Sequence, residues 1–435
     1  MALEKAAIGW KKIAGLGVGL VVAGQFAGWN YGLAAGGWAN MMLATTLMSV
    51  LCFGLALCVA ELAAAIPNAG GLYIYCQAAF GRPAGFAVGV AVFTALTIST
   101  GAAAEFIAAY TQSVLGFGGV WLKILLFAAI LGVHLRGVGE ALAVLLGAGA
   151  LAVAALLVFG VAMAPHFELR NLAGGGGMHV DPRGVLACVP FAIILFLSIE
   201  QTAASAEEAA DPGRDVPLGV SAAIAVLLVT AMCVLVLGTG AGGAERLGRA
   251  EDPLLAAMSG VSPHTAQWLA PIVGGGAVLG LVATLFSMIY GASRQLFALA
   301  RDGYAPGWMT WANRAGAPAP ALALITVIGF PLSFIPPGKL LVAVVLLLSA
   351  SYVVVLASFI HLRLTRPNLP RPFRTPGGAA TAGLALVLSI AAFVACLQVD
   401  RALMAGLGAG AVCAAVWFLA SGRANATADL ADEAT

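Results

Sequence analysis

The sequence predicts an all-α polytopic membrane protein with twelve transmembrane helices. Only 9% of its 435 residues are charged and 61% are hydrophobic, whereas a soluble domain typically carries about 25% charged residues. At about 20 apolar residues for each span, little chain is left for an extramembrane domain. The 55 glycines favour closely packed helices, because small residues let transmembrane helices approach one another. A large soluble catalytic module is therefore excluded.

Twelve apolar stretches, separated by turn and charge signals, are the candidate spans. They cover residues 13–37, 39–66, 84–112, 118–135, 140–163, 184–206, 216–240, 267–297, 319–335, 338–362, 378–397 and 401–421. If the N-terminus is inside, the inside segments hold more than twice as many Lys and Arg residues as the outside segments. The positive-inside rule then predicts that both termini are cytoplasmic.

The first and sixth spans are predicted to be broken helices. Gly24, Gln25, Gly28 and Asn30 lie in the middle of the first span, where glycine costs about 1 kcal/mol of helix propensity and an unpaired amide costs more. In the sixth span, the run 196–202 places a carboxyl and an amide at a similar depth. Unwound backbone at membrane depth is tolerated only where protein or a water-filled cavity surrounds it. Two such spans at corresponding positions indicate a transporter built from an inverted repeat.

This reading makes residues 1–435 a single transmembrane domain. Residues 13–163 form the first five-helix repeat, 184–362 the second, inverted repeat, and 378–421 two additional helices. Residues 422–435 are expected to be a disordered cytoplasmic tail. The substrate site is predicted between the two breaks.

Two carboxyl groups lie deep inside predicted spans, Glu200 in the sixth and Glu105 in the third. Such a group costs at least about 2.5 kcal/mol and persists only with a partner or a role. Each also has a structural interpretation: Glu200 could be neutral or hydrogen-bonded to the unwound backbone of the first span, and Glu105 could be protonated or paired with an arginine. Because Lys123 is the only basic residue well within a span, the two carboxyls predict an acidic cavity suited to a cation.

The predicted substrate-binding residues surround the two breaks. They are Gly24, Gln25, Phe26, Gly28, Trp29, Asn30, Glu105, Phe196, Ser198, Glu200, Gln201 and Tyr290. Aromatic rings among them could enclose a small cation, an interaction of up to about 2 kcal/mol when desolvated.

A second set consists of candidates for gating or coupling. It comprises Glu61, Glu140, Glu208, Arg214, Thr284 and Ser287. Glu61 and Glu140 lie at span ends, where they could pair with Arg301 or Arg136. Glu208 and Arg214 belong to a charged turn directly after the broken sixth span, a placement that favours a gate or anchoring network over a merely solvated loop.

The sequence gives no support for a metal site or an enzyme. The five histidines form no i, i+4 pair and have no Cys or carboxylate at ligand spacing, and we interpret the seven cysteines as small buried hydrophobes. A nucleophile elbow is also absent from the sequence. We therefore expect no catalytic residues and no cofactor. A net charge of +2 gives no reason to expect a nucleic-acid partner.

Several runs together resemble the amino acid, polyamine and organocation (APC) transporter superfamily, and more closely its ethanolamine permease branch. They include ELAAAIPNAGGLYIY at 61–75 and AEEAADPGRDVP at 206–217, with further runs at 79–81, 137–141, 163–167, 171–172, 293–295 and 300–303 and with Glu200. The resemblance implies two inverted five-helix repeats plus two helices, with substrate held at the breaks of spans one and six.

The resemblance also bears on the substrate. Amino-acid members have a Gly-Ser-Gly type turn in span one whose backbone amides bind the substrate carboxylate. The matching positions here are Gly28, Trp29 and Asn30, which agrees with a substrate that has an ammonium but no carboxylate. Ser198 stands where amino-acid members usually have glycine, and Glu200 is kept.

Coupling is left open between protons, sodium, exchange and uniport. Some family members carry a lysine in span five, but residues 140–163 contain none. A sodium site of the inverted-repeat fold usually takes neighbouring hydroxyls from span eight. Thr284 and Ser287 are three residues apart, so they share a helix face without being the adjacent pair.

We therefore expect a secondary transporter of the bacterial inner membrane that moves a small protonated amine, such as ethanolamine, by alternating access. The ammonium would lie against Glu200 or Glu105. The alternative within the superfamily is an amino-acid permease or exchanger. From other classes, a channel or a membrane sensor using the same site remains open.

Overall fold

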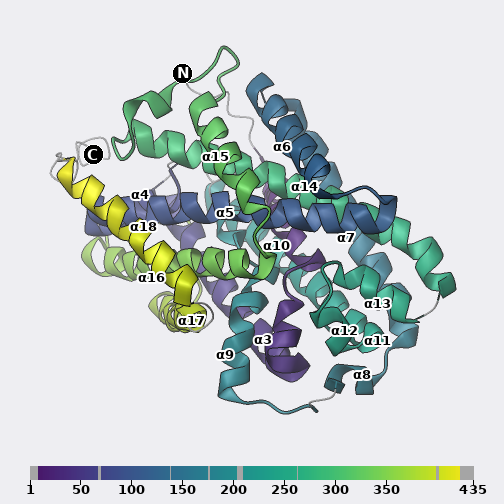
Figure 1. Ribbon diagram of the computed structural model, residues 1–435. Helices are drawn as coiled ribbons and strands as arrows, with labels where there is room; N and C mark the ends of the chain where they lie inside the picture. Colours follow the sequence, from purple (N-terminus) through teal and green to yellow (C-terminus); the bar gives the residue numbers. More distant parts are fainter. Residues whose placement is uncertain are drawn as a thin grey trace.

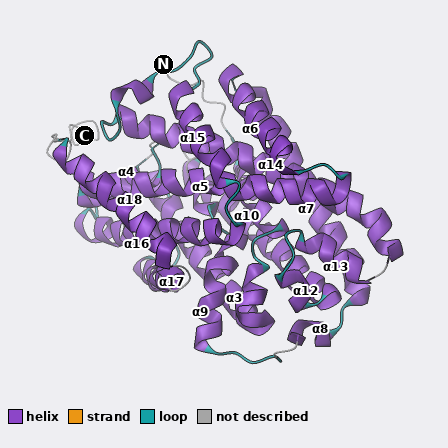
Figure 2. Cartoon of the chain, in the orientation of Figure 1, coloured by secondary structure: helices purple, strands orange, loops and turns teal. Residues whose placement is uncertain are grey.

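The computed structural model describes residues 8–66, 70–137, 139–174, 177–202, 209–261, 263–397 and 401–421. Within these ranges every regular element is a helix (Figures 1 and 2). An isolated parallel bridge also joins Ile8 to Ala209. It connects the segment before the first span to the segment after the sixth.

The helices of the first half lie in the stretches predicted as spans one to five or in the connections that follow those spans. They are α1 (Trp10–Val21), α2 (Ala23–Phe26), α3 (Tyr31–Ala65), α4 (Leu72–Phe80), α5 (Arg82–Leu115), α6 (Gly119–Arg136), α7 (Gly139–Met163), the 3-10 helix η1 (Ala164–His166) and α8 (Leu169–Ala173). Gly37 in α3 has a φ of 79°, a conformation that glycine adopts without the steric cost of a side chain. The chain bends there, between the predicted first and second spans.

The second half begins with another interrupted helix. Its elements are α9 (Pro182–Ala192), the 3-10 helix η3 (Ile193–Leu195), α10 (Pro212–Met232), the π-helix η5 (Cys233–Gly238), α11 (Thr239–Gly242), α12 (Ala244–Gly248), α13 (Pro253–Val261), α14 (Pro263–Arg301), the 3-10 helix η6 (Gly307–Thr310), α15 (Ala319–Leu332), α16 (Pro337–Thr365), α17 (Ala379–Leu397) and α18 (Arg401–Ala420). The short helices α4, α8, α12 and α13 lie outside the predicted spans, because they are too short to register as apolar stretches.

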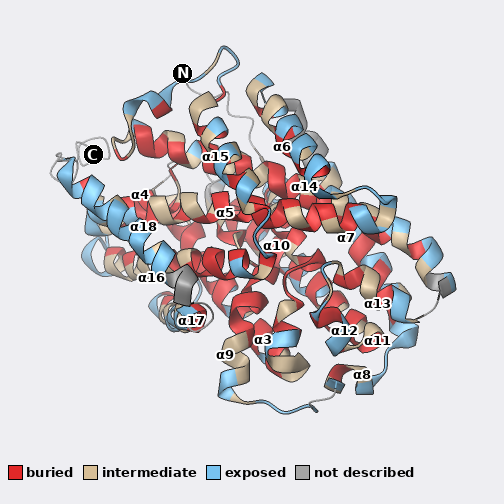
Figure 3. Ribbon diagram, viewed as in Figure 1, coloured by how far each residue is buried: buried red, intermediate tan, exposed pale blue. Residues whose placement is uncertain are grey.

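Nine helical segments in the described part of the chain are long and apolar enough to cross a membrane, and two shorter apolar helices cover 319–332 and 405–420. This agrees with an all-α polytopic membrane protein, while the count of twelve spans stays a prediction. In the most apolar stretch of α16, 72% of the residues are buried, whereas in that of α6 only 28% are buried. Figure 3 shows the same contrast between the buried interior around α5 and the more exposed peripheral helices α6 and α18.

Candidate functional site

The helical backbone is interrupted in both spans where the sequence predicts a break. After α2, Ala27 is extended and Gly28 has a φ of 98°. After η3, Ser198 has a φ of 71° and is the only non-glycine residue with positive φ in the described ranges. A non-glycine residue in this region carries conformational strain, which clusters at functional sites.

The two breaks contact each other directly. The Gln25 side chain donates from Nε2 to the carbonyl oxygen of Leu195 at 2.9 Å, and Gln25 is fully buried. Gly24 lies against the carbonyl of Ile194, so closely that a Cβ at Gly24 would collide with that oxygen. The first span therefore packs backbone to backbone on the sixth at this point.

Side chains from several elements hold the first break in place. The Tyr110 hydroxyl of α5 donates to the Phe26 carbonyl at 2.8 Å. Trp29, which is fully buried, donates from Nε1 to the Gln25 carbonyl at 3.1 Å. These bonds satisfy carbonyls that the interrupted helix has freed, as buried polar groups require.

Asn30 links the same break to the segment around α12. Its Oδ1 accepts from the Gly28 backbone N–H at 3.1 Å, and its Nδ2 donates to the carbonyls of Leu247 and Ala250 at 2.9 and 2.8 Å. Asn30 therefore connects the first break to the segment around α12 by hydrogen bonds.

A cavity of about 70 Å³ lies between the breaks. Its lining comes from the first span (Leu20, Val21, Ala23, Gly24, Ala27), α5 (Ser99, Ala102, Ala103, Phe106), the sixth span (Ile194, Leu197, Ser198), α14 (Leu281, Thr284, Met288) and α16 (Leu341, Val344). All of these residues are buried or half-buried. The volume is far below the roughly 300–1,000 Å³ of sites for drug-sized ligands, so the cavity suits a small solute.

The cavity is apolar, contrary to the acidic cavity expected from the sequence. Among the described residues, its lining contains three hydroxyl side chains, those of Ser99, Ser198 and Thr284, and none that is acidic or basic. Thr284 donates to the Gly19 carbonyl at 3.3 Å. The expectation was wrong because depth in a span does not say which way a side chain points.

Glu200 is buried but does not line this cavity. Its Oε1 accepts from Gln201 at 3.4 Å, while its Oε2 has no hydrogen-bond partner in the described residues. The hydroxyl of Tyr352 in α16 is also buried and lies next to this carboxyl. Glu200 is therefore not among the residues that line this cavity.

Glu105 is paired within the protein. Lys123 of α6 donates to Glu105 and, at 2.6 Å, to the carbonyl of Ser333. The ammonium lies 4.4 Å from the centroid of the Phe334 ring. This pairing compensates the Glu105 charge, so the acidic bias expected of the cavity is absent there.

Among the predicted substrate residues, the structure brings Gly24 and Ser198 to the cavity wall. Gln25, Phe26, Gly28, Trp29, Asn30 and Phe196 are buried around it. Tyr290 of α14 is occupied elsewhere, since the guanidinium of Arg294 lies 4.3 Å from its ring centroid. Sequence reasoning missed the apolar wall from α5, α14 and α16, whose residues look like ordinary core positions.

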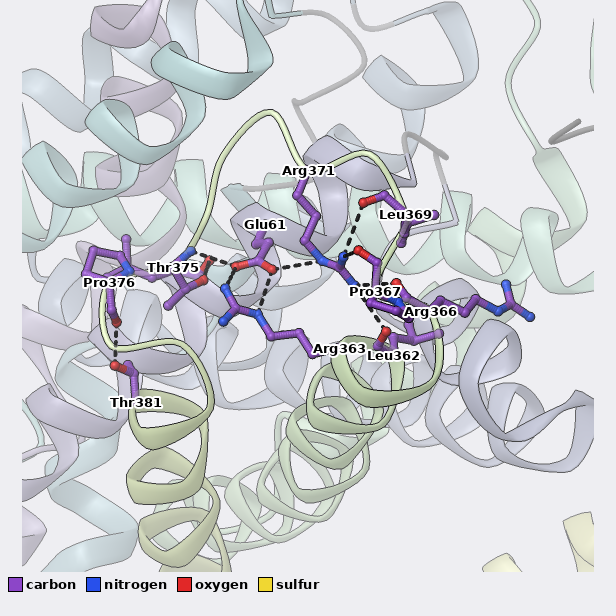
Figure 4. A network of polar contacts seen from close by, with 11 residues as sticks. Glu61, Leu362, Arg363, Arg366, Pro367, Leu369, Arg371, Thr375, Pro376 and Thr381 are labelled. Atoms are coloured by element: carbon purple, nitrogen blue, oxygen red, sulfur yellow. Dashed lines mark hydrogen bonds and ion pairs between the residues drawn. The ribbon is translucent and has the colours of Figure 1, made fainter.

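The gate candidates fall into different environments. Glu61 ends the second span within a buried network (Figure 4). Its expected partners, Arg301 or Arg136, were wrong: Arg363 donates two hydrogen bonds to it, at 3.0 and 2.7 Å, and Arg371 lies 3.2 Å away. Both partners lie about 300 residues further along the chain, beyond the reach of local sequence reasoning.

The remaining gate candidates are less informative. Arg214 is exposed at the start of α10. Thr284 reaches the cavity, whereas Ser287 donates to Ala283 of its own helix at 2.8 Å. The side chain of Glu140, the whole of Glu208 and the tail 422–435 lie outside the described residues.

The close contact at Gly24 gives a first testable prediction. Gly24→Ala should weaken solute binding more than tenfold, because the added methyl forces the two breaks apart. Gly19→Ala, in the preceding helix α1, is the matched control, since a Cβ added at that position would have no other atom within 4 Å. Binding is measured by ligand-induced thermal stabilisation of the purified protein, and equal affinity in both variants would contradict the role of this contact.

Comparison with known proteins adds independent findings. The family model described as amino acid permease matches residues 13–420. The branched-chain amino acid permease BcaP of Bacillus subtilis (strain 168) is 24% identical over 403 residues, which are 86% of this chain and 84% of that protein. The methylthioribose transporter of the same organism is 25% identical over 386 residues, or 83% and 82% of the two chains. An uncharacterized transporter of Rhizobium meliloti (strain 1021) is 29% identical over 313 residues, or 67% of this chain and 64% of that one.

Proposed function

Because the chain belongs to the amino acid permease family, whose model matches residues 13–420, we propose that it is a secondary transporter for a small amino-acid-like solute with an apolar side chain. The proposed site is the cavity between the two breaks. The observation that carries the proposal is the lining of that cavity, which among the described residues is apolar apart from three hydroxyl side chains.

Recognition follows from what the cavity offers. It lies where α2 ends, and the carbonyl end of a helix attracts a cation such as an ammonium group. The Gln25 and Phe26 carbonyls each accept one hydrogen bond from the protein, so the ammonium would use the second lone pair of such a carbonyl. An aliphatic or thioether side chain would gain about 1.5–3 kcal/mol from burial against the apolar wall. Ethanolamine has no such side chain. The described lining residues also include no carboxylate that could bind its ammonium.

The relatives support the same choice. Two are described as carriers of branched-chain amino acids and of methylthioribose. Both solutes have an apolar portion, so these descriptions favour the amino-acid alternative over the ethanolamine reading of the motifs.

Architecture and location form part of the proposal. The arrangement comprises twelve spans in two inverted repeats, at 13–163 and 184–362, followed by two helices at 378–421. Bacterial relatives and the distribution of basic residues support an inner-membrane location with both termini cytoplasmic. Alternating access would then move one repeat against the other around the breaks.

The test is thermal stabilisation of the detergent-purified protein by leucine, isoleucine, valine, methionine, methylthioribose, alanine and ethanolamine. A solute at 100 times its Kd should add about 2.7 kcal/mol, and we expect this from the aliphatic or sulfur-containing solutes. Stabilisation by ethanolamine alone would overturn the proposal and support the amine substrate.

A pair of variants locates the site. Ala103→Leu fills the cavity wall and should weaken binding more than tenfold. Ala109→Leu makes the same change on α5 at a half-buried position that does not line the cavity. If both variants bind equally well, the solute is held somewhere else.

A further inference from the structure

A second hollow, distinct from the substrate cavity, lies between α3, α10 and α17. This groove has a volume of about 400 Å³. It is lined by Val50, Phe53, Gly54, Leu57, Pro217, Leu218, Ser221, Phe373, Pro376, Thr381, Leu384 and Ala385. Ten of these twelve residues, Gly54 included, have no polar side-chain group, so the groove is suited to hydrocarbon.

The groove opens outward from the helix bundle. Val50 and Phe53 of α3 are 42% and 40% exposed, Leu218 of α10 is 44% exposed and Leu384 of α17 is 53% exposed. In a membrane-spanning chain, such apolar side chains face lipid. The groove is therefore accessible from the bilayer.

Positive charge gathers where the groove meets the loop between α16 and α17. Arg374 lies directly between Phe373, which lines the groove, and Thr375. Arg214 precedes the lining residue Pro217 by one helical turn. The two segments touch, because Gly213 packs against Pro372. Both arginines are exposed.

These charges are not compensated in the described part of the chain. The side chains of Arg374 and Arg214 have no hydrogen bond or ion pair there. Glu61 is already engaged by Arg363 and Arg371. Of the two nearby aspartates, Asp215 is buried and accepts from the Asp211 backbone, which leaves Asp211 as the exposed one.

The loop that carries Arg374 is anchored (Figure 4). The Thr375 backbone N–H donates to Glu61 at 2.6 Å, and the Thr375 hydroxyl donates at 3.0 Å to the carbonyl of Leu57, itself a groove residue. Arg371 donates to four carbonyls of the preceding turn, those of Leu362, Arg366, Pro367 and Leu369. These contacts thus hold Arg374 at the edge of a preformed apolar groove.

We propose that this groove is a binding site for an anionic phospholipid, with an acyl chain along α3 and the headgroup phosphate at Arg374 and Arg214. Basic clusters beside membrane helices recognise anionic lipid headgroups. The groove supplies the hydrocarbon-binding half of the site and the arginines supply the charge. The site does not depend on which solute the protein carries.

Native mass spectrometry of the detergent-purified protein tests this, using phosphatidylglycerol and phosphatidylcholine of equal chain length. We expect phosphatidylglycerol to bind more tightly. Arg374→Gln and Arg214→Gln should each weaken it about fivefold, the equivalent of ~1 kcal/mol for one basic residue near the surface. Leu218→Trp, which fills the groove at an exposed position, should weaken both lipids.

The matched control is Arg314→Gln. Arg314 is exposed in a loop that Asn313 ties to α6, far from α17 in Figure 1. Equal binding of the two lipids, or an equal loss in Arg314→Gln, would overturn the proposal. So would binding of soluble glycerol phosphate as tight as that of the lipid, because the acyl chain would then contribute nothing.

Discussion

Replacing Glu61 by glutamine should lower the free energy of unfolding by about 3 kcal/mol, because it leaves two guanidinium groups facing each other without a carboxylate. Glu61 is 1% exposed, and the side chains of Arg371 and Arg363 are 8% and 25% exposed. Removing one partner of a buried ion pair typically costs about 3–5 kcal/mol. The partial exposure of Arg363 places the expectation at the lower end of that range. Thermal and denaturant unfolding of the purified protein measure it.

The control is Glu245→Gln, which breaks the exposed pair with Arg249. The side chains of that pair are 67% and 77% exposed, and such surface pairs contribute about 0–1 kcal/mol. The Glu61 variant should therefore be much the less stable of the two. If both variants unfold alike, the network in Figure 4 does not stabilise the fold.

The double variant Glu61→Gln with Arg371→Gln separates charge from packing. Removing Arg371 relieves the repulsion that the single variant creates, so part of the lost stability should return. A double variant less stable than the single one would show that Arg371 contributes mainly through its hydrogen bonds to the loop carbonyls.

The breaks in the helices were predictable because their cause is local. Gly24, Gly28 and the amides of Gln25 and Asn30 are poor residues for a continuous apolar helix, and the backbone departs from helical geometry at Ala27 and Gly28. Ser198 fits the same logic less directly, since nothing in serine itself requires a positive φ. Local composition thus predicts where a helix stops, within a few residues.

The arginine partners of Glu61 were not predictable from the sequence, because their pairing with Glu61 depends on tertiary contacts. Glu61 and Arg363 are 302 residues apart, and several other arginines lie at span ends. Trp29 illustrates the same limit. The sequence placed an indole in the break, but only the structure shows that it bonds back to Gln25 and stays out of the cavity.

The apolar lining of the cavity could not be predicted from the sequence either. Ser99, Ala102, Ala103 and Phe106 of α5 line it, whereas Glu105 of the same helix does not. One residue of a helix is rotated by about 100° from the next, so a carboxyl at substrate depth can point to another helix. The depth of a residue in the membrane and the direction of its side chain are separate properties, and the sequence indicates only the depth.

The Glu105–Lys123 pair allows that distinction to be tested. Lys123→Met should destabilise the protein by about 3 kcal/mol, because the Glu105 carboxylate, whose side chain is 26% exposed, loses the only basic side chain with which it pairs in the described residues. The double variant Glu105→Gln with Lys123→Met should recover most of the loss, since a buried ion pair can be replaced by neutral groups at little cost. Unfolding of the two variants gives the comparison, with the exposed Glu168–Arg170 pair broken by Arg170→Gln as the control.

Ligand binding by the single variant Glu105→Gln then decides the role of the carboxyl. If Glu105 serves Lys123 alone, Glu105→Gln lowers stability but leaves the affinity for the stabilising solute unchanged, because the cavity wall at Ser99, Ala102 and Ala103 is intact. If Glu105 binds the ammonium of the substrate, the affinity falls at least tenfold and the Lys123→Met variant binds more tightly than the parent. The geometry favours the first outcome, since the Glu105 carboxylate already contacts one ammonium, that of Lys123.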